Sequence, residues 1–568
     1  MLKGKFYEVR FSVGALLLIV AWVYPYSAGP SPDALQQLFM LAMFSLAAIA
    51  FGTRAIPLTF SAALLAGMVL MLVTPNPYWS RPIAGVAGLM LAGLAAHVGS
   101  HVRHSPVALF ALLIAIVMAA FLNAVEGLLQ WSDLTGEMYR WMVIPENRGI
   151  AFGAFRQRNL FATFLCVGGV CLVWLVHLKK VTEPMAWFVT LVLMTGVAAS
   201  GSRTGALEVA ILAVLAVLFR KRNSSVVTRL LAAQLILLAG AMMLLPMIAN
   251  ALGFDFVPGA AREIGGDQNP RLVIWSNSLD LILQRPLFGW GWRDMGYAHY
   301  VTLFDVRHNE LLENAHNLPL QLALEFGIPA TLGFFLLIAW ATGSAKPWQL
   351  NPLGPQDGGL YKADSTFAWA ILVIIGFHSL LEFPLWTSGY LFLAGLFMGY
   401  ALPTRNEKPN IYNAVSPYLA RVLAVGLFIL AVVGWQQYAR VILIYKTPFT
   451  NNKEVQRAAV LAAYNKASNA WLFQEQLDVV RLGTAEITPE NAADIRKLAE
   501  KLLHFSAEPM IIQPLLLSLW YVGDLGALRF HAERFCRAAP EAFERWYAWP
   551  YNKSMTLALG PKSQLCKP

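Results

Sequence analysis

Residues 106–130 read PVALFALLIAIVMAAFLNAVEGLLQ, an apolar run that contains a single charged side chain, Glu126. Apolar runs of roughly 17 to 25 residues are long enough to cross the hydrocarbon core of a bilayer as helices. We interpret thirteen runs of the sequence in this way, at about 10–26, 35–51, 57–74, 82–98, 106–130, 160–178, 185–200, 204–219, 230–250, 326–342, 365–381, 388–402 and 419–438. The sequence therefore predicts an all-α polytopic membrane protein.

The composition supports this fold class. Of the 568 residues, 57% are hydrophobic and 13% are charged, whereas about a quarter of the residues of a soluble globular protein are charged. This balance excludes a soluble globule. We attribute the net charge of +10 to membrane topology and to contacts with anionic membrane lipids, and we expect no nucleic-acid partner.

Basic residues in the short loops predict the orientation. Lysine and arginine collect in short cytoplasmic loops, and one side of the predicted bundle carries Lys3, Lys5, Arg10, Arg54, Arg103, Lys179, Lys180, Arg220, Lys221, Arg222, Arg229, Lys346, Lys362, Arg405 and Lys408. The short loops opposite carry Arg81 and Arg203. The N-terminus is therefore predicted to be cytoplasmic and, with an odd number of spans, the C-terminal tail to lie outside. The first run lacks a small-residue cleavage site, so we expect it to be retained.

Changes in composition predict four regions. We assign residues 1–150 to N-terminal spans and a first outer loop, 151–400 to a catalytic membrane region, 401–438 to the last span and 439–568 to a helical C-terminal domain. The region 151–400 includes an outer loop, 251–325, that is too long to be a passive connector.

Two helices are predicted within this outer loop. Asn269-Pro270-Arg271 has the pattern of a helix start, and Arg285-Pro286 follows as a stop. Asn317-Leu318-Pro319 opens a second helix, which Gly327 ends or passes into the next span. The outer loop is thus expected to carry the functional site of the chain.

The C-terminal tail predicts paired antiparallel helices. Alternating alanine, leucine and aromatic positions occur in 458–471, 495–503 and 528–540, although no firm repeat period is found. An oxidising exterior would permit a disulfide between Cys536 and Cys566, but the spacing of the cysteines leaves that pairing open. A packing domain and a binding domain both fit this pattern.

Polar clusters mark the predicted helix starts on the outer side. Gln157-Arg158-Asn159 and Ser202-Arg203-Thr204 each open a span, and Arg271 and His316 lie at the starts of the two loop helices. Helix N-termini expose unpaired N–H groups and a partial positive charge, which attract phosphate. Two arginines added there can hold a phosphate or pyrophosphate with paired hydrogen bonds. The clusters predict an anionic substrate.

Plainer interpretations of these residues remain open. Arg203 could anchor its helix to lipid headgroups, Arg271 could pair with Asp267, and Gln157 and Arg158 could serve as capping and interface residues. His378, Glu382 and Trp386 would share one face if their helix continues, which Pro384 makes doubtful. Glu382 is either part of the site or a structural hydrogen-bonding group.

His316 is the candidate general base. The positive end of the helix that follows it would disfavour protonation, and a neutral imidazole can accept a proton from an attacking hydroxyl. Glu313 or Asn317 could orient the ring, while capping or binding of a lipid headgroup is the alternative role of the histidine.

A metal site is not favoured by the sequence. Asp267, Asp294, Asp305, Glu310 and Glu313 form no close D-x-D pair, and His308 and His316 have no third ligand in register. We therefore expect metal-independent chemistry and no cofactor.

The same residues carry a family resemblance. The stretch from Ala315-His316-Asn317 through Gln321 to Glu325-Phe326-Gly327-Ile328 resembles the A-H-N-x-x-L-Q-x-x-x-E-x-G-I signature of the O-antigen ligase (WaaL/Wzy) superfamily. Gly201-Ser202-Arg203 resembles its G-S-R motif, and Pro270-Arg271 its second arginine segment. Gln157-Arg158-Asn159 and 378–386 are closer to the PglL/PglS branch, the bacterial protein O-oligosaccharyltransferases. Phe383 stands where that branch is expected to have tyrosine.

The resemblance implies a GT-C-like enzyme of the bacterial inner membrane. It would transfer an oligosaccharide whole from undecaprenyl pyrophosphate to a serine or threonine hydroxyl of an acceptor protein, typically a type IV pilin, on the periplasmic side. It also implies that His316 is the essential histidine, that Arg203 and Arg271 face the donor pyrophosphate and that Gln157 supports the site. We expect inversion at the anomeric carbon.

Other functions stay open at this stage. The acceptor could be a lipid A core sugar, as for an O-antigen ligase, or a growing glycan, as for a polymerase. A lipid or solute transporter is the alternative from another class. Transporters tend to show internal repeats and polar breaks near the bilayer midplane, whereas this chain concentrates its polar residues at one surface, which disfavours transport.

Overall fold

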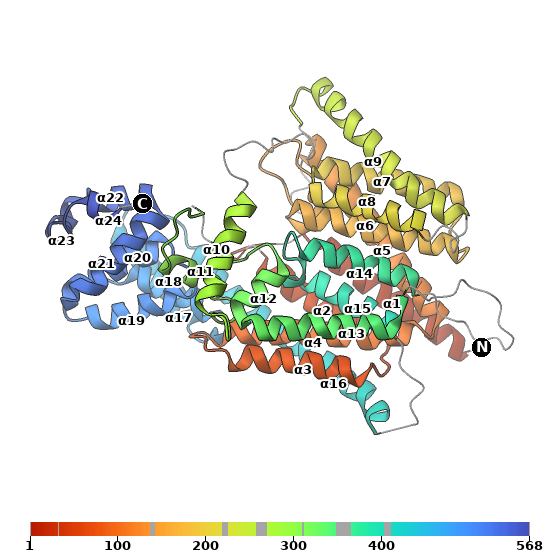
Figure 1. Cartoon of the computed structure of the whole chain (residues 1–568), viewed down its shortest axis with the longest axis horizontal. Coiled ribbons are helices and arrows are strands. Elements are labelled where there is room, and N and C mark those ends of the chain that lie inside the picture. Colours follow the sequence, from red (N-terminus) through yellow and green to blue (C-terminus); the bar gives the residue numbers. More distant parts are fainter. Residues whose placement is uncertain are drawn as a thin grey trace.

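A computed structural model of the chain describes residues 2–25, 27–31, 33–136, 142–218, 225–256, 270–308, 312–347, 365–402 and 411–566. Within these ranges the regular secondary structure is helical and contains no strand. A bundle of long helices fills one part of the molecule and a helical C-terminal domain the other, with short helices between them (Figure 1).

Each of the thirteen predicted runs falls on a helix. In the described ranges these helices are α1 Leu2–Val23, α2 Ala34–Phe51, α3 Leu58–Val73, α4 Ser80–Val102, α5 Pro106–Ser132, α6 Arg158–His177, α7 Glu183–Ser200, α8 Arg203–Leu218, α9 Ser225–Ala251, α13 Ile328–Ala345, α14 Thr366–Ser379, α15 Ser388–Ala401 and α16 Ile411–Tyr445. Among the described residues, 8 helices are long and apolar enough to cross a membrane: α2, α4, α5, α6, α7, α9, α13 and α16. A multi-pass membrane protein is confirmed, while the total of thirteen spans stays a prediction.

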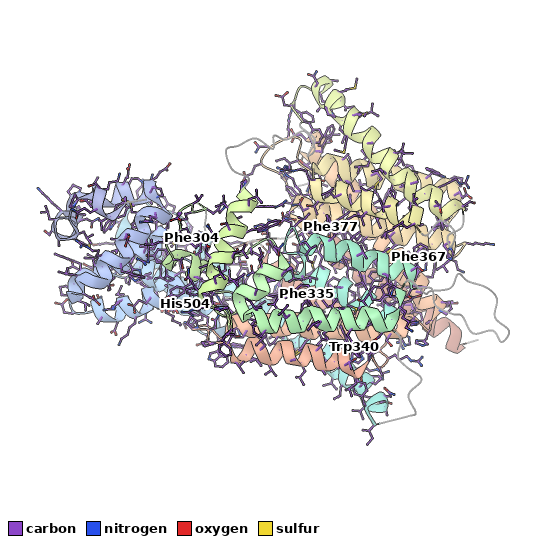
Figure 2. The ribbon with its side chains drawn as sticks, in the orientation of Figure 1. Phe304, Phe335, Trp340, Phe367, Phe377 and His504 are labelled. Carbon is purple, nitrogen blue, oxygen red and sulfur yellow. A yellow bond between two sulfur atoms is a disulfide. The ribbon has the colours of Figure 1, made fainter. Side chains whose placement is uncertain are left out.

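Helix α6 is the centre of the bundle. Its most apolar 18-residue window is 94% buried, whereas that of α13 is 6% buried. α5, α7, α8, α9 and α14 pack around α6. The side chains of Phe335 and Trp340 lie along α13 on the outside of the bundle (Figure 2). The start of α6 is therefore held on several sides, which matters because it carries Gln157, Arg158 and Asn159.

Small residues bring α4 and α15 into close contact. A Cβ atom on Gly395 would overlap the carbonyl of Ala92, and one on Gly399 would overlap the carbonyl of Ala96. Across the same interface, a Cβ on Gly99 would overlap the carbonyl of Leu396. Helices in a bilayer associate through close packing of small residues rather than through burial of apolar surface from water.

The two predicted loop helices are present. α10 Pro270–Gln284 begins at the predicted proline and ends before Arg285, and α12 Leu318–Phe326 begins after Asn317. Asn269 lies outside the described residues. Gly327, with φ +85, separates α12 from α13. A third short helix, α11 Met295–Val301, lies between α10 and α12 in the chain.

The C-terminal domain consists of helices, and all of them except the first contribute to one apolar core. They are α17 Lys453–Ala467, α18 Gln474–Thr484, α19 Ala492–Leu503, α20 Pro509–Val522, α21 Leu525–Ala538, α22 Pro540–Tyr547, α23 Lys553–Leu559 and α24 Lys562–Leu565. Leu502, Ile512, Leu515, Leu528 and Phe535 are buried together. The helices expected in 458–471, 495–503 and 528–540 correspond to α17, α19 and α21.

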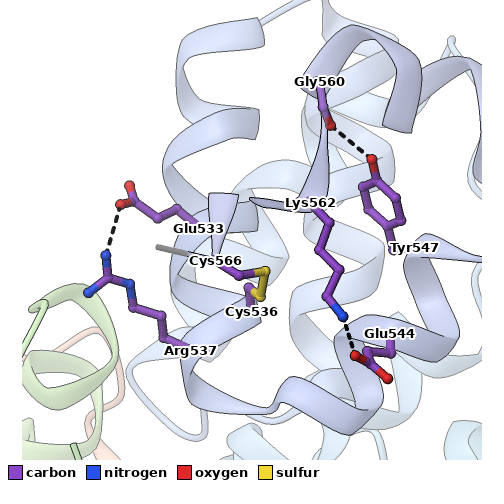
Figure 3. The surroundings of a disulfide bond; sticks show 8 residues. All are labelled: Glu533, Cys536, Arg537, Glu544, Tyr547, Gly560, Lys562 and Cys566. Atoms are coloured by element: carbon purple, nitrogen blue, oxygen red, sulfur yellow. Dashed lines mark hydrogen bonds and ion pairs between the residues drawn. A yellow bond between two sulfur atoms is a disulfide. The ribbon is translucent and has the colours of Figure 1, made fainter. Parts of the chain in front are cut away.

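A disulfide closes the end of this domain. Cys536 at the end of α21 is bonded to Cys566 after α24 (Figure 3). Lys562 pairs with Glu544, and the Tyr547 hydroxyl donates to the carbonyl of Gly560 at 2.8 Å. The disulfide that the sequence left open is therefore formed.

Four short 3-10 turns complete the secondary structure of the described residues: η2 Gly153–Phe155, η5 Pro384–Trp386, η6 Trp471–Phe473 and η7 Pro550–Asn552.

One helix crosses the predicted boundary between residues 438 and 439. α16 runs unbroken from Ile411 to Tyr445 and is longer at both ends than the predicted span. At a rise of 1.5 Å per residue its 35 residues extend about 52 Å, well beyond a hydrocarbon core of about 30 Å. The helix therefore leaves the membrane and forms part of the C-terminal domain, where Tyr438 and Val441 pack against Ala467 and Leu477.

Buried charges fix this domain to the bundle. Arg81 at the start of α4 lies 3.9 Å from Asp294 of the loop and 3.8 Å from Glu475 of α18. The Tyr78 hydroxyl donates to Asp478 at 3.1 Å. His504, which Figure 2 shows near the short loop helices, lies 3.1 Å from Asp294. The bundle, the loop and the C-terminal domain therefore meet in one polar junction.

The close contact of α4 with α15 predicts a destabilised variant. Gly399→Val should lower the free energy of unfolding by about 1–3 kcal/mol or more, because the added atoms overlap the backbone of α4. Thermal unfolding of the detergent-purified protein measures the change. Gly426→Val on α16 is the control, since no atom lies within 4 Å of a Cβ there. Equal melting temperatures for the two variants would contradict the packing argument.

Candidate functional site

The carboxylate of Glu382 is the centre of the site. The residue is 5% exposed, and its Oε1 atom accepts hydrogen bonds from Asn159 Nδ2 at 2.9 Å and from Arg271 Nη2 at 2.5 Å. Oε2 lies 2.8 Å from His316 Nδ1 and 3.5 Å from Gln157 Nε2. One carboxylate therefore joins the start of α6, the start of α10 and the residue before the N-cap of α12.

Glu382 does not lie on a continued α14. The helix ends at Ser379, the chain turns through Leu380 and Leu381, and Pro384 opens the short 3-10 turn η5. The helix on which His378, Glu382 and Trp386 would share one face therefore does not continue, in line with the doubt that Pro384 raised. Proline disfavours helical geometry in the residue before it, which here is Phe383. The turn aims Glu382 at the site, while Trp386 stacks on Trp292 with ring centroids 6.1 Å apart.

Local backbone geometry sets the position of His316. Its φ is +51, in the left-handed region that histidine adopts more often than most residues. The backbone N–H donates to Asn314 Oδ1 at 2.8 Å, and the ring meets the edge of Phe383 with centroids 5.1 Å apart. The imidazole is thereby turned toward Glu382 from the residue that precedes the N-cap of α12.

Asn317 ties this segment to the end of α14. Its Oδ1 accepts from the backbone N–H of Leu320 at 3.1 Å, as expected of an N-cap, and its Nδ2 donates to the carbonyl of Leu380 at 3.0 Å. The prediction that Glu313 or Asn317 orients the imidazole is wrong. Glu313 is exposed and lies 3.9 Å from Arg293, and the carboxylate that holds the ring is that of Glu382.

The starts of α6 and α8 are joined by a second set of hydrogen bonds. Gln157 is the N-cap of α6, with Oε1 accepting from the N–H of Leu160 at 2.6 Å. The Ser202 hydroxyl donates to Asn159 Oδ1 at 2.6 Å and accepts from the N–H of Gly205 at 3.0 Å. Asn159 therefore links the G-S-R segment to Glu382.

The three arginines of the predicted clusters lie at helix starts. Arg158 and Arg203 are the first residues of α6 and α8, and Arg271 is the second residue of α10. Arg203 has an exposed side chain, and Arg158 is half-buried. Arg271 pairs with Glu382 and keeps 34% of its side chain exposed. The alternative partner Asp267 lies outside the described residues.

A second polar layer lies beneath the site and was missed by the sequence analysis. Thr163 Oγ1 donates to Glu208 Oε1 at 2.8 Å and lies 2.5 Å from His378 Nδ1, with Glu208 and His378 fully buried. Thr163 follows Asn159 by four residues on α6, and His378 precedes Glu382 by four. The layer therefore lies about one helical turn deeper. The detectable signal was Glu208, a carboxyl within an apolar run.

Glu325, at the end of the A-H-N-x-x-L-Q-x-x-x-E segment, supports the structure around the site. Glu325 is fully buried, where its Oε1 accepts from Gln321 Nε2 at 2.8 Å and from the backbone N–H of Arg293 at 2.9 Å. Burial raises the pKa of Glu325 to about 7, against the lowering effect of these hydrogen bonds. Its role is to hold the turn after α10, which connects the site to the junction with the C-terminal domain.

The electrostatics of the site favour an ionised Glu382. Burial by itself would raise the pKa of its carboxyl, but the hydrogen bond from His316, together with the hydrogen bond and positive charge of Arg271, outweighs that effect and lowers the pKa below its usual value. Among the described residues, no group of three or more His, Cys, Asp or Glu side chains could hold a metal ion. Metal independence stays a prediction.

The chain matches two protein-family models. Residues 188–335 match the model described as O-Antigen ligase, and residues 366–552 match the model described as Virulence factor membrane-bound polymerase, C-terminal. The first match contains Arg203, Arg271 and His316, and the second contains Glu382. Two segments of this chain are therefore similar to the membrane-bound O-antigen ligases and polymerases that these models describe.

The chain is also similar to a curated protein. The chain is 22% identical over 333 residues to a protein of Acinetobacter baylyi named General O-oligosaccharyltransferase, which covers 56% of this chain. The chain spans 55% of the length of that relative. The predicted PglL-type resemblance is confirmed at the level of the family.

The lowered pKa of Glu382 predicts a pH-dependent contribution to stability. Because the pKa is lower in the folded state, the ionised carboxylate stabilises the protein above the ordinary carboxyl pKa. This stabilisation is lost as the pH falls through the folded-state value. Glu382→Gln should therefore lower the melting temperature at pH 7, and the difference from wild type should shrink toward pH 3–4.

Melting curves of both proteins at several pH values measure this effect. Glu486→Gln, on an exposed residue that pairs with Arg457 at 3.6 Å, is the control and should stay within about 0.5 kcal/mol of wild type. A melting-temperature difference for Glu382→Gln that is independent of pH would contradict the ionised carboxylate.

Proposed function

We propose that this protein is an O-oligosaccharyltransferase. It takes an oligosaccharide whole from undecaprenyl pyrophosphate and transfers it to a serine or threonine hydroxyl of an acceptor protein, a type IV pilin, at the periplasmic face of the bacterial inner membrane. The observation that carries the proposal is the pairing of His316 Nδ1 with Glu382 at 2.8 Å, at a point where several helix starts meet. The match of residues 188–335 to the O-antigen ligase model and the name of the curated relative support glycan transfer.

The histidine supplies the base in this reaction. A hydrogen bond from Nδ1–H to the Glu382 carboxylate fixes the tautomer in which Nε2 carries the lone pair. The acceptor hydroxyl gives its proton to Nε2 as its oxygen attacks the anomeric carbon. The bond from that carbon to the pyrophosphate oxygen breaks, and its electron pair leaves with the pyrophosphate. Displacement in one step inverts the anomeric configuration.

Helix starts and arginines stabilise the leaving group. The N-termini of α6, α8 and α10 carry partial positive charge, and Arg203 and Arg271 add two guanidinium groups near them. Charge that develops on the departing pyrophosphate is then met by preorganised donors, which is commonly the largest contribution to catalysis. This step uses no metal ion and no cofactor.

Glu382 has a double role in this scheme. It pairs with Arg271 and accepts a hydrogen bond from His316 in the absence of substrate, so that the charge of Arg271 is compensated in a partly buried site. A pyrophosphate that binds Arg271 would take over part of this compensation. The carboxylate would then stabilise the imidazolium that forms when His316 accepts the proton.

Two observations support the proposed orientation of the protein. The basic residues Arg54, Arg103, Lys179, Lys180 and Lys346 follow the ends of spans at the end of the bundle opposite the site, which favours a cytoplasmic position of that end. The Cys536–Cys566 disulfide lies in the C-terminal domain, and disulfides persist in oxidising compartments such as the periplasm.

A second candidate function is an O-antigen ligase that transfers glycan to a lipid A core sugar. The family model matched by residues 188–335 carries that name. The chemistry at His316 and the arginines would be the same, because both acceptors present a hydroxyl group. The acceptor therefore distinguishes the two functions.

Reconstitution tests the reaction. Purified protein is mixed with a lipid-pyrophosphate oligosaccharide and a candidate pilin, and intact mass reports the glycan on the pilin. His316→Ala should lower transfer by at least 10³-fold because the base is lost. Arg271→Ala should lower it by about 10²-fold because charge stabilisation is lost. Glycan on lipid A core alone would identify a ligase.

Matched variants control this assay. His308→Ala removes a histidine from the same loop, and Arg481→Ala removes an exposed arginine of α18; both should transfer at wild-type rates. Unchanged transfer by His316→Ala would remove the base from the scheme. A product that retains the anomeric configuration of the donor would rule out displacement in one step.

Cysteine labelling tests the orientation. A membrane-impermeant maleimide added to intact spheroplasts should label Glu313→Cys, next to the site, because its side chain is exposed. Lys180→Cys, after the end of α6, should be labelled only after lysis. The reverse pattern would place the site in the cytoplasm and would exclude a periplasmic reaction.

A further inference from the structure

A hollow lies between the outer loop and the C-terminal domain, separate from the catalytic residues. Its volume is about 440 Å³, within the range of ligand pockets. The end of α10, the turn after it, α11 and α21 provide its walls. We call it the loop–domain pocket and define it by Gln284, Arg285, Trp290, Tyr297, Phe530 and Arg534.

Aromatic rings and arginines form the walls of the loop–domain pocket. The guanidinium of Arg285 lies 4.0 Å over the ring of Trp290, and that of Arg534 lies 3.4 Å over the ring of Phe530. Tryptophan, tyrosine and arginine are the residues most enriched at the energetic centres of protein interfaces. The pocket therefore has the composition of a polypeptide-binding surface.

The walls are held in place before any ligand binds. Trp290 Nε1 donates to the carbonyl of Leu281 at 2.9 Å, and Arg534 Nε donates to the carbonyl of Val301 at 2.7 Å. The Tyr300 hydroxyl lies 3.1 Å from His531 Nδ1 and joins α11 to α21. A preorganised surface loses little conformational entropy on binding.

The two arginines differ in their availability to a ligand. Arg534 is 13% exposed and lies 3.6 Å from Glu533, so its charge is largely compensated. Arg285 is exposed and stacks on Trp290. The charge offered by the loop–domain pocket is therefore positive and comes mainly from Arg285, which is complementary to a carboxylate.

Exposed apolar residues neighbour the pocket residues Gln284, Arg285 and Trp290 in the chain. Leu283 is 73% exposed, Leu287 63% and Phe288 83%, although the opposite face of α10 is buried through Ile274, Leu281 and Ile282. Exposed apolar side chains clustered beside polar ones mark interaction sites. A ligand that fits would carry an acidic side chain next to an apolar one.

The distance to the catalytic site fits a segment of the acceptor. Arg271 and Gln284 lie at opposite ends of α10, about 20 Å apart along the helix axis at its ordinary rise per residue. An extended polypeptide covers that distance in about six residues. A chain held in the loop–domain pocket could therefore present a hydroxyl at His316.

We propose that the loop–domain pocket binds the acceptor polypeptide through an acidic residue followed by an apolar one, about six residues from the glycosylated hydroxyl. The proposal rests on the proposed function, because it assigns the acceptor of that reaction. Arg285 pairs with the acidic side chain, and Trp290 with Phe288 contacts the apolar one. The C-terminal domain then contributes one wall of the acceptor site through α21.

Peptide binding without donor tests the proposal. The probes are fluorescein-labelled alanine-based peptides with a serine and, six positions on, aspartate, asparagine or lysine followed by leucine. Fluorescence anisotropy with the detergent-purified full chain should give at least tenfold tighter binding for aspartate than for lysine. Arg285→Glu should reverse this order, and Phe288→Ser should weaken binding of all three peptides.

Arg481→Glu is the matched control, since this exposed arginine lies on α18 outside the loop–domain pocket; it should keep the wild-type order. Equal affinities for the three peptides, or an unchanged order in Arg285→Glu, would overturn the proposal. The loop–domain pocket would then be a lipid contact or a packing feature. Because no glycan donor is present, a wild-type protein that binds in the expected order but transfers no glycan would refute the proposed function alone.

Discussion

The buried carboxylate of Glu382 is the interaction on which the site depends. It accepts hydrogen bonds from Asn159 and Arg271 and pairs with His316, so that segments far apart in the chain converge on two oxygen atoms. An unpaired carboxylate in this position would be strongly unfavourable. The cost of burying it is offset only when all of these segments are in place, and the carboxylate therefore specifies how the helix starts assemble.

The site is built in two polar layers within a largely apolar bundle. The upper layer contains Glu382 and Asn159, and the lower layer contains Thr163, Glu208 and His378. α6 contributes to both layers, while α14 supplies His378 and the turn after α14 supplies Glu382. A side chain in the upper layer is thus supported by a neighbour one turn below, on a helix that is itself enclosed. This arrangement restricts the movement of the catalytic groups, which precise proton transfer requires.

The C-terminal domain is connected to the helix bundle that carries the site. α16 passes from the bundle into that domain without a break, and the ion pairs of Arg81 connect the bundle, the loop and α18. The turn that Glu325 holds lies next to this junction. The loop–domain pocket is therefore placed at a defined distance from the catalytic residues, since the elements that form its walls are fixed to the bundle that carries them.

The sequence by itself determined which segments form helices and where several of them start. Apolar runs, N-caps such as Gln157 and Asn317, and prolines in first helical turns act locally, because they depend on neighbouring residues and on solvation by lipid. For the same reason the helix starts that carry Arg203, Arg271 and His316 were predictable.

Only the tertiary structure decided which groups meet. The sequence did not indicate that Glu382 rather than Glu313 holds the imidazole, that Asn159 links two helix starts, or that Thr163, Glu208 and His378 form one buried layer. These contacts join residues separated by up to 223 positions for Glu382 and Asn159. They depend on how helices pack, which local propensity does not encode. The physical reason is that a hydrogen bond across a bundle requires the relative positions of two helices, whereas a cap or an apolar run requires only one.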